Sequence, residues 1–335
     1  MREALYWQLE EQKVRCLLCP HRCLLSEGKV GKCKVRFNKD NKLYTRAFGN
    51  LCALALDPIE KKPLYHFLPS TKTLSIAHEG CNLQCKNCQN FTISQTISEK
   101  VVDKLLPQQL VQLAINKNIP SISFTYTEPT IFYEYVLETA QLSHSYGIKN
   151  VLVSNGYILA TPLQQLAPFI DAVNIDVKAF DDEVYKDLTG AHLRPVLDSI
   201  LYLVEQGIHV ELTYLMVPSF SDDQEQIYEF VRWMVQHSLG YIPIHFSRFF
   251  PTYKLKQLEP TPLHRMQNAF SIAQKQGIKY VYQGNVGFVD NATYCPICQN
   301  KLIERTTGYE VHFLGIKNGK CSRCGQKIYG VFENL

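Results

Sequence analysis

The chain carries three cysteines within one short stretch, "CNLQCKNC" at residues 81–88, with three residues between the first two and two between the last two. Thiolates are ligands that zinc and iron–sulfur clusters prefer. A closed zinc site and a cubane cluster held wholly by protein each need four protein ligands. Cys81, Cys85 and Cys88 therefore either take a fourth ligand from elsewhere or leave one coordination position open for chemistry.

An open iron of a 4Fe-4S cluster would be chelated by a small molecule with amino and carboxylate groups. S-adenosylmethionine (SAM) is such a molecule, and one electron breaks its C–S bond to give methionine and a radical that abstracts hydrogen from a substrate. The cofactors then do the hard chemistry, while the protein supplies orientation, redox tuning and exclusion of water. The alternatives are a zinc site that borrows His78, and free thiols.

The composition describes a globular chain of 335 residues, with 46% hydrophobic and 20% charged residues. No apolar run approaches the roughly 18 residues of a spanning helix, and the charged N-terminus does not resemble a signal peptide. We therefore expect a cytoplasmic protein without membrane contact, in which clustered cysteines are metal ligands and not disulfides. The net charge of +4 is dispersed, which does not favour nucleic-acid binding.

Strand-like and helix-like segments alternate through the middle of the chain, which predicts an α/β fold with a parallel sheet. Helical patterns such as 193–207 and 223–239 separate the expected strands. A doubly wound sheet and a full or partial barrel both fit, and six or seven units favour the barrel. The expected strands are 73–80, 121–129, 150–156, 171–180, 209–218, 242–251 and 279–285.

Polar residues follow the expected strands, where parallel sheets place their ligand sites. Asp176 and Lys178 stand two apart on one strand and so share a face. The cysteine triplet also follows a strand end, so the predicted cluster site lies at the edge of the sheet where we expect ligands to bind. The polar residues at strand ends are Glu79, Thr127, Glu128, Ser154, Asn155, Asp176, Lys178, Arg248, Gln283 and Asn285.

Two C-x-x-C pairs near the C-terminus, Cys295/Cys298 and Cys321/Cys324, flank a 22-residue β-like excursion. This spacing predicts a zinc ribbon, with a mononuclear iron site as the alternative. We expect the metal to act mainly as a structural staple, since so short a module needs one to fold.

Four further cysteines, Cys16, Cys19, Cys23 and Cys33, crowd the N-terminal region, with His21 as a substitute ligand. Their spacing fits zinc or an auxiliary iron–sulfur cluster. The remaining cysteine, Cys52, is expected to be a small buried hydrophobe. The predicted units are a cysteine-rich extension (1–71), a barrel (72–290) and a zinc-ribbon module (291–335).

The CxxxCxxC triplet after the first strand resembles the signature of the radical SAM superfamily, whose fold is a partial (β/α)6 barrel of TIM type. The resemblance implies that Glu128, beside Thr127, binds the SAM amino group and that Lys178, beside Asp176, meets the SAM carboxylate. It places Ser154 and Asn155 near the ribose or methionine. Many members carry an aromatic residue where this chain has Asn87.

Each of these residues also has a structural interpretation. Glu128 would cap a helix, "SNG" would form a turn, and Asp176 would pair with Lys178. On the sixth strand, His245 and Arg248 would reach ribose or substrate, although a strand histidine is more often a core residue. In the insert 57–67, Lys61, Lys62 and His66 are candidate substrate contacts. For the two lysines we expect solvated charges instead, and the role of His66, which stands between aromatic residues, stays open.

The segments "CLLCPHRCLLSEGKVGKCKVR", 56–90 and "HFSRFFPTYKL" resemble the radical SAM protein of the AmmeMemoRadiSam system, similar to pyruvate formate-lyase activating enzyme. The resemblance implies Memo-like and AMMECR-like protein partners and an electron donor such as flavodoxin or ferredoxin. Alternative functions are a glycyl-radical-enzyme activase, an iron–sulfur electron carrier, and a zinc-ribbon nucleic-acid binder.

Overall fold

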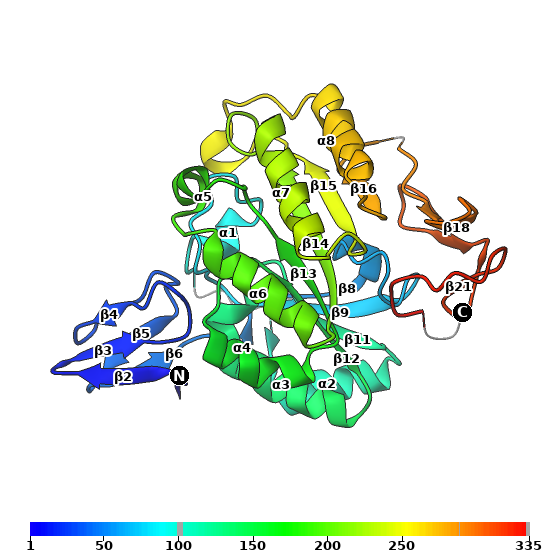
Figure 1. Ribbon diagram of the computed structural model, residues 1–335. Helices are drawn as coiled ribbons and strands as arrows, with labels where there is room; N and C mark the ends of the chain where they lie inside the picture. Colours follow the sequence, from blue (N-terminus) through cyan, green and yellow to red (C-terminus); the bar gives the residue numbers. More distant parts are fainter. Residues whose placement is uncertain (99–102, 288, 333–335) are drawn as a thin grey trace.

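The computed structural model describes residues 1–98, 103–287 and 289–332 (Figure 1). Positions 99–102 and 288 of the predicted barrel, and 333–335 of the predicted ribbon, lie outside the described residues. At the centre of the described part is an eight-stranded sheet with the order β16-β15-β14-β13-β12-β11-β9-β8. Its parallel strands are β9 (Lys72–Ala77), β11 (Ser121–Phe124), β12 (Lys149–Ser154), β13 (Ala172–Asp176), β14 (His209–Met216), β15 (Ile244–Arg248) and β16 (Val281–Gly284).

All seven strands expected from the sequence are confirmed, and the sheet has edges at β8 and β16, so it forms a partial barrel. One edge was not anticipated: β8 (Ala53–Pro58) pairs antiparallel with β9. The central sheet therefore begins before the boundary predicted at residue 72. The sequence pattern alone assigns residues 53–58 to the N-terminal extension, because it does not show which strand they pair with.

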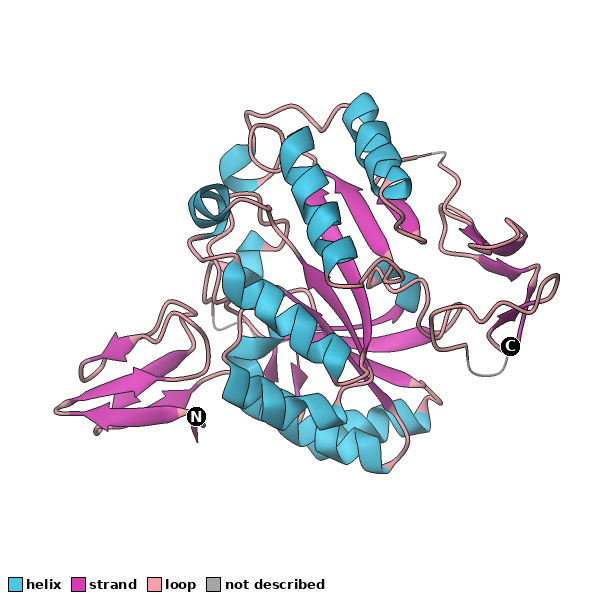
Figure 2. Cartoon of the chain, viewed as in Figure 1, coloured by secondary structure: helices cyan, strands magenta, loops and turns pink. Residues whose placement is uncertain are grey.

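The longer helices cover the outer side of the sheet (Figure 2). Asp223 caps α7 by accepting hydrogen bonds from the backbone of Glu225 and Gln226. The helices are α1 (Phe91–Ser94), α2 (Pro107–Asn116), α3 (Tyr133–Ser145), α4 (Ala160–Leu166), α5 (Asp182–Thr189), α6 (Arg194–Glu205), α7 (Gln224–Gln236) and α8 (Leu263–Lys275), with the 3-10 turns η1 (Ile59–Lys61), η2 (Pro129–Phe132), η3 (Ala167–Phe169) and η4 (Tyr253–Leu255).

A plug segment, residues 59–68, packs its apolar side chains against Val151 and Ala172 of β12 and β13. It is anchored by the buried carboxylate of Glu211, which accepts hydrogen bonds from the backbone N–H groups of Tyr65 and His66 at 3.0 and 2.7 Å. Glu211 also contacts Nε2 of His209 at 3.0 Å and Nε2 of His245 at 2.7 Å. Burial would raise the pKa of Glu211, but these histidine contacts lower it overall.

The expectation of solvated lysines is wrong for Lys62. Its ammonium group is buried, with 2% of the side chain exposed, and it lies 2.6 Å from Oδ2 of Asp57. Lys61 pairs with Oδ1 of the same carboxylate at 2.9 Å but remains 47% exposed. β8 brings Asp57 into the sheet, which gives the buried cation of Lys62 a partner.

The N-terminal extension forms two small sheets that share the main hydrophobic core with the barrel. Its buried Arg36 pairs with Glu134 of α3. The strands are β1 (Arg2–Glu3), β5 (Arg36–Lys39) and β6 (Lys42–Thr45) in one sheet, β2 (Trp7–Glu10), β3 (Lys13–Cys16) and β4 (Leu24–Leu25) in the other, and β7 (Asn50–Leu51), which pairs with β10 (Asp103–Lys104).

The C-terminal module forms the expected hairpin and returns to the plug segment. Val331 exchanges backbone hydrogen bonds with His66 and Leu68, and His66 contacts the carbonyl of Tyr329 and the hydroxyl of Tyr282. His66 is therefore a satisfied core residue. The strands are β17 (Thr293–Tyr294), β18 (Lys301–Arg305), β19 (Val311–Phe313), β20 (Ile316–Lys317) and β21 (Lys320–Cys321).

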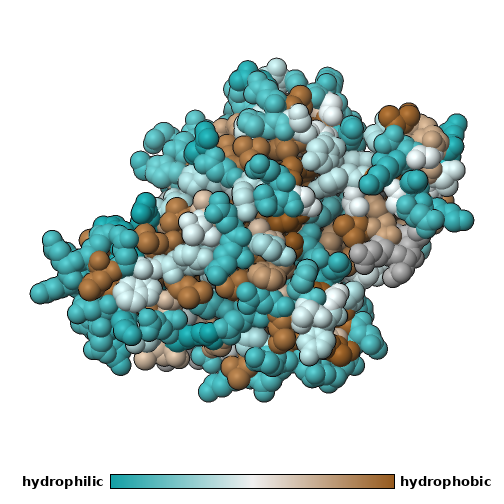
Figure 3. All heavy atoms as spheres, turned by 60° about the horizontal axis from the view of Figure 1, so that its bottom comes forward, coloured by the Kyte–Doolittle hydropathy of each residue, from teal (hydrophilic) through white to brown (hydrophobic). Residues whose placement is uncertain are grey.

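Hydrophobic side chains lie scattered among hydrophilic ones on the face shown in Figure 3. Within the described residues, no helix has both the length and the apolar character needed to cross a membrane.

The buried ring of His78 makes the stability of the fold sensitive to acid. It packs against Phe132 and Tyr135, its Nε2 has no hydrogen-bond partner, and burial lowers its pKa to about 3. Because the unfolded chain binds a proton at His78 below about pH 6.5 and the folded chain does not, stability falls with pH from there down to the folded pKa. The slope is about 1.4 kcal/mol per pH unit.

We expect His78→Phe to remove this dependence while keeping the aromatic packing. Between about pH 7.5 and about pH 5, the unfolding free energy of the variant should fall less than that of the wild type by about 2 kcal/mol. Urea denaturation at the two pH values measures the difference. His312→Phe, at an exposed position, is the control, and equal losses in His78→Phe and wild type would contradict the prediction.

Candidate functional site

The cluster loop, residues 79–90, carries Cys81, Cys85 and Cys88 and follows β9 directly. It is fastened to the end of α5, since the backbone N–H groups of Gln84 and Lys86 donate to Thr189 and Leu188 at 2.8 and 2.9 Å. Sγ of Cys81 accepts from the backbone of Leu83 at 3.4 Å, and Sγ of Cys88 lies 3.0 Å from Oγ of Ser94. The loop is therefore held by α5, Cys81 by a contact within the loop, and Cys88 by a contact with α1.

In the described part of the chain, the three thiols of the cluster loop do not form a compact single-ion group. Within the described residues, the C-terminal quartet gathers its ligand atoms to within 4.8 Å, whereas the cluster loop provides no such group. The ring of His78 packs on Phe132 and Tyr135, so the borrowed-histidine zinc site is not supported. Burial raises the pKa of Cys81 strongly and that of Cys85 to about 12, so these thiols need a cationic partner to ionise.

The carboxylate of Glu128 joins the ends of two strands. Oε1 accepts hydrogen bonds from the backbone and hydroxyl of Thr130 at 2.9 and 2.7 Å and from Ser154 at 2.8 Å. Oε2 accepts from the backbone of Asn155 at 2.8 Å. Glu128 thus caps η2, as the structural interpretation expected, and it keeps acceptor capacity on Oε2. Burial raises its pKa despite these hydrogen bonds.

Asn155 connects this carboxylate to the cluster loop. Its Nδ2 lies 2.9 Å from Oδ1 of Asn82 and 3.9 Å from Sγ of Cys81. Thr127 makes a further link, because its hydroxyl donates to the carbonyl of His78 at 2.6 Å. Four of the predicted residues, Thr127, Glu128, Ser154 and Asn155, therefore lie around the start of the cluster loop.

Asp176 and Lys178 lie near Cys85 of the cluster loop. Nζ of Lys178 is 2.7 Å from Oδ2 of Asp176, which confirms that the two side chains share a face. Burial alone would lower the pKa of Lys178, but Asp176 and then the nearby Cys85 raise it overall. The structural ion pair is present, and it places a cation beside the thiols.

Two predicted residues lie apart from this group. His245 is 3% exposed within the Glu211 cluster, and it also lines the pocket described next. Arg248 donates from Nε to the carbonyl of Thr261 at 2.8 Å and stacks on Phe250.

A pocket of about 350 Å³ lies between the ends of β14, β15 and β16 and the hairpin of the C-terminal module. Thr213, one of its lining residues, is the register partner of Asp176, so the pocket adjoins the cluster loop side of the sheet. Buried Oε2 of Glu60 and Nε of Arg305 have no hydrogen-bond partners there. Sequence reasoning missed both residues, because neither belongs to a motif or to a parallel strand end.

Asn87 is 4% exposed, and its Oδ1 has no hydrogen-bond partner. A buried acceptor without a partner costs free energy, so a donor from a bound molecule would be stabilising here. This is the position at which the chain differs from the resemblance.

The C-terminal thiols form a compact quartet. Sγ of Cys295 is 3.6 Å from Sγ of Cys324, and Sγ of Cys298 is 3.6 Å from Sγ of Cys321. A tetrahedral zinc ion with bonds of about 2.3 Å sets its sulfurs about 3.8 Å apart. The spacing is therefore that of a single-ion site.

The comparisons with known proteins agree with this geometry. The model of the radical SAM superfamily matches residues 75–231, which include the cluster loop and the ends of β9 to β14. An uncharacterized protein of Methanocaldococcus jannaschii is 43% identical over 98% of this chain and 99% of its own length. The pyruvate formate-lyase 1-activating enzyme of Escherichia coli is 23% identical over 61% of this chain and 89% of its own length.

The chain belongs to the radical SAM superfamily. It is therefore an enzyme, and the family implies a 4Fe-4S cluster and SAM as cofactors. The crystal structure of SuiB from Streptococcus suis bound to S-adenosylmethionine matches with a TM-score of 0.50 and 14% identity, over 68% of this chain and 53% of that chain, and shows the common fold. The superfamily and the partial barrel predicted from the sequence are confirmed.

Gly80 lies at the start of the cluster loop. Its φ is +105°, and a Cβ there would lie 2.5 Å from the carbonyl oxygen of Cys33 and 3.0 Å from Val35. Gly207 has a φ of +74°, and a Cβ added to it would meet no atom within 4 Å, so it isolates the backbone effect from the clash.

We expect Gly207→Ala to cost about 1–2 kcal/mol from its backbone conformation alone. Gly80→Ala should cost that amount plus about 1–3 kcal/mol from overpacking against the N-terminal extension. Urea denaturation of the two variants measures the difference, and equal losses would show that the extension gives way at no cost.

Proposed function

We propose that this radical SAM enzyme works in the AmmeMemoRadiSam set, cleaving SAM reductively and abstracting hydrogen from a substrate held in the pocket beside Thr213. The observation that carries the proposal is the convergence of three thiols, a buried carboxylate and a lysine where neighbouring parallel strands end. A bound 4Fe-4S cluster with SAM on its open iron supplies the one-electron cleavage of the C–S bond.

The roles of the chain's residues follow from their charge and position. Cys81, Cys85 and Cys88 hold the cluster. Oε2 of Glu128, with its remaining acceptor capacity, binds the SAM amino group, with Thr127 beside it.

Lys178, oriented by Asp176, binds the SAM carboxylate. Ser154 and Asn155 lie near the ribose or the methionine. Oδ1 of Asn87 accepts a hydrogen bond from the adenine amino group, which gives its unpartnered oxygen a donor. His245 and Arg248 lie on the side of the substrate, and His245 lines the pocket in which we place it.

The partners we propose are the Memo-like and AMMECR-like proteins, with flavodoxin or ferredoxin as electron donor. The support is the resemblance of the N-terminal cysteines, the insert and the terminal ribbon to that system. A glycyl-radical-enzyme activase is the second candidate, because the curated relatives include pyruvate formate-lyase activating enzymes. Membership of an enzyme superfamily does not support the electron-carrier and nucleic-acid-binding alternatives.

The first test is anaerobic reconstitution with iron, sulfide and reductant, followed by measurement of 5'-deoxyadenosine. We expect the wild type to form it from SAM and Cys85→Ala to lose at least about 99% of this activity, because a cluster lacking a thiolate is not held. Cys52→Ala is the matched control, since Cys52 is a partly buried thiol outside the three cysteine sets. SAM-dependent formation of 5'-deoxyadenosine that persists in Cys85→Ala would contradict the assignment of Cys85 as a cluster ligand.

Deuterium transfer then separates the two candidate substrate classes. Label from a small molecule or a Memo-like or AMMECR-like protein in the 5'-deoxyadenosine supports the AmmeMemoRadiSam set. Label only from a backbone glycine of a large partner enzyme supports the activase.

We also propose that Cys295, Cys298, Cys321 and Cys324 bind one structural zinc ion. We expect Cys298→Ser to lose about one zinc per chain and to destabilise the module, because these short strands have only a small core of their own. Elemental analysis and limited proteolysis of the full chain measure both effects. An unchanged zinc content in Cys298→Ser, with zinc retained in wild type, would contradict the assignment.

A further inference from the structure

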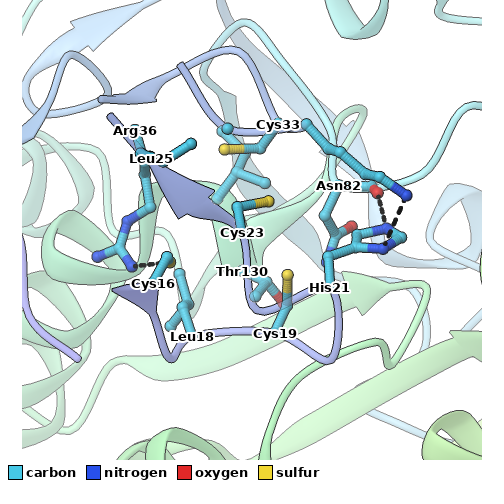
Figure 4. A pocket seen from close by; sticks show the side chains of 13 residues that line it. Cys16, Leu18, Cys19, His21, Cys23, Leu25, Cys33, Arg36, Asn82 and Thr130 are labelled. Carbon is cyan, nitrogen blue, oxygen red and sulfur yellow. Dashed lines mark hydrogen bonds between the residues drawn. The ribbon is translucent and has the colours of Figure 1, made fainter. Parts of the chain in front are cut away.

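The N-terminal thiols face a small cavity between the extension and the barrel (Figure 4). Cys16 ends β3, Cys19 and Cys23 lie in the turn that follows, and Cys33 precedes β5. The cavity of about 20 Å³ is also lined by Asn82 of the cluster loop. Cys19, Cys23 and Cys33 line this one cavity (Figure 4).

The spacing of this quartet differs from that of the C-terminal quartet. Both sets have four cysteines in the described part of the chain, yet only the C-terminal one brings its sulfurs within 4.8 Å of one another. A single tetrahedral ion draws its four sulfurs to about 3.8 Å. The N-terminal thiols do not form such a compact group, yet all four line one cavity, which favours a cluster of several irons over a single ion.

Hydrogen-bond donors surround these sulfurs. Cys33 accepts from the backbone N–H groups of Val35 and Arg36, and Cys19 accepts from that of His21. Nη1 of the buried Arg36 lies 3.4 Å from Sγ of Cys16. Burial raises the pKa of both Cys19 and Cys33 overall, and these donors partly offset that effect. Donors to the ligand sulfurs also tune the potential of a bound cluster.

The N-terminal quartet lies next to the cluster loop on both sides of Cys81. On one side, the carbonyl oxygen of Cys33 is so close to Gly80 that a Cβ added at Gly80 would lie 2.5 Å from it. On the other, Nε2 of His21 contacts the carbonyl oxygen of Asn82 at 2.8 Å. The two cysteine sets therefore share a wall made of residues 80–82.

We propose that Cys16, Cys19, Cys23 and Cys33 hold an auxiliary 4Fe-4S cluster that passes electrons to the radical SAM cluster across this wall. The inference rests on the proposed function, because the receiving cluster is the one that cleaves SAM. An electron from a low-potential one-electron donor first reduces the auxiliary cluster and then moves to the cluster of Cys81, Cys85 and Cys88. No covalent bond forms or breaks, and the auxiliary cluster returns to its oxidised state.

Metal content tests the site. In the reconstituted full chain we expect about eight irons and about eight sulfides per molecule, as two clusters of four. The double variant Cys19→Ala/Cys23→Ala and the variant Cys85→Ala should each retain about four irons, and both should keep the zinc of the C-terminal quartet, which reports folding. A wild type with about four irons and a second zinc would overturn the proposal without any variant, and so would a full iron content in the double variant.

The kinetics of reduction test the electron transfer. With reduced flavodoxin as the donor, we expect the electron paramagnetic resonance signal of the SAM-responsive cluster to appear at least tenfold more slowly in Cys19→Ala/Cys23→Ala. Cys52→Ala is the control and should reduce at the wild-type rate. Equal rates in the double variant and wild type would overturn the relay.

The two proposals fail differently. If wild type forms no 5'-deoxyadenosine, the proposed function fails, but the iron content still decides whether the quartet holds a cluster.

Discussion

The carboxylate of Glu128 is the contact on which the geometry of the site depends. It is buried and receives four hydrogen bonds from Thr130, Ser154 and Asn155, so it ties the end of β11 to the end of β12. Asn155, held by this carboxylate through its backbone, then reaches Asn82 and Cys81. A charged group in this position is affordable only because its oxygens are so well satisfied.

A second buried carboxylate organises the opposite part of the barrel. Glu211 gathers His209, His245 and the backbone of the plug segment, and the plug in turn binds the C-terminal module through His66 and Val331. Apolar plug residues fill the space inside β12 and β13. The C-terminal module is therefore fastened to the barrel, where its Arg305 forms one wall of the pocket beside Thr213.

The three cysteine sets have three different environments in one chain. The C-terminal set is compact, with sulfur pairs at 3.6 Å. The N-terminal set lines a cavity, and the middle set has three thiols near a lysine and a carboxylate. Spacing along the sequence predicts metal binding in all three, and the short sulfur–sulfur distances identify the C-terminal set as a single-ion site.

The sequence by itself determined the parallel strands, the cysteine sets and the shared face of Asp176 and Lys178, because these follow from local periodicity and residue type. Only the tertiary structure decided that β8 joins the sheet, that Lys62 is buried against Asp57, and that Glu60 and Arg305 line a pocket. It also placed Cys33 and His21 beside Gly80 and Asn82. These contacts join residues that are far apart in the chain. A local sequence pattern does not show which distant residue pairs with a buried charge or packs against a given loop.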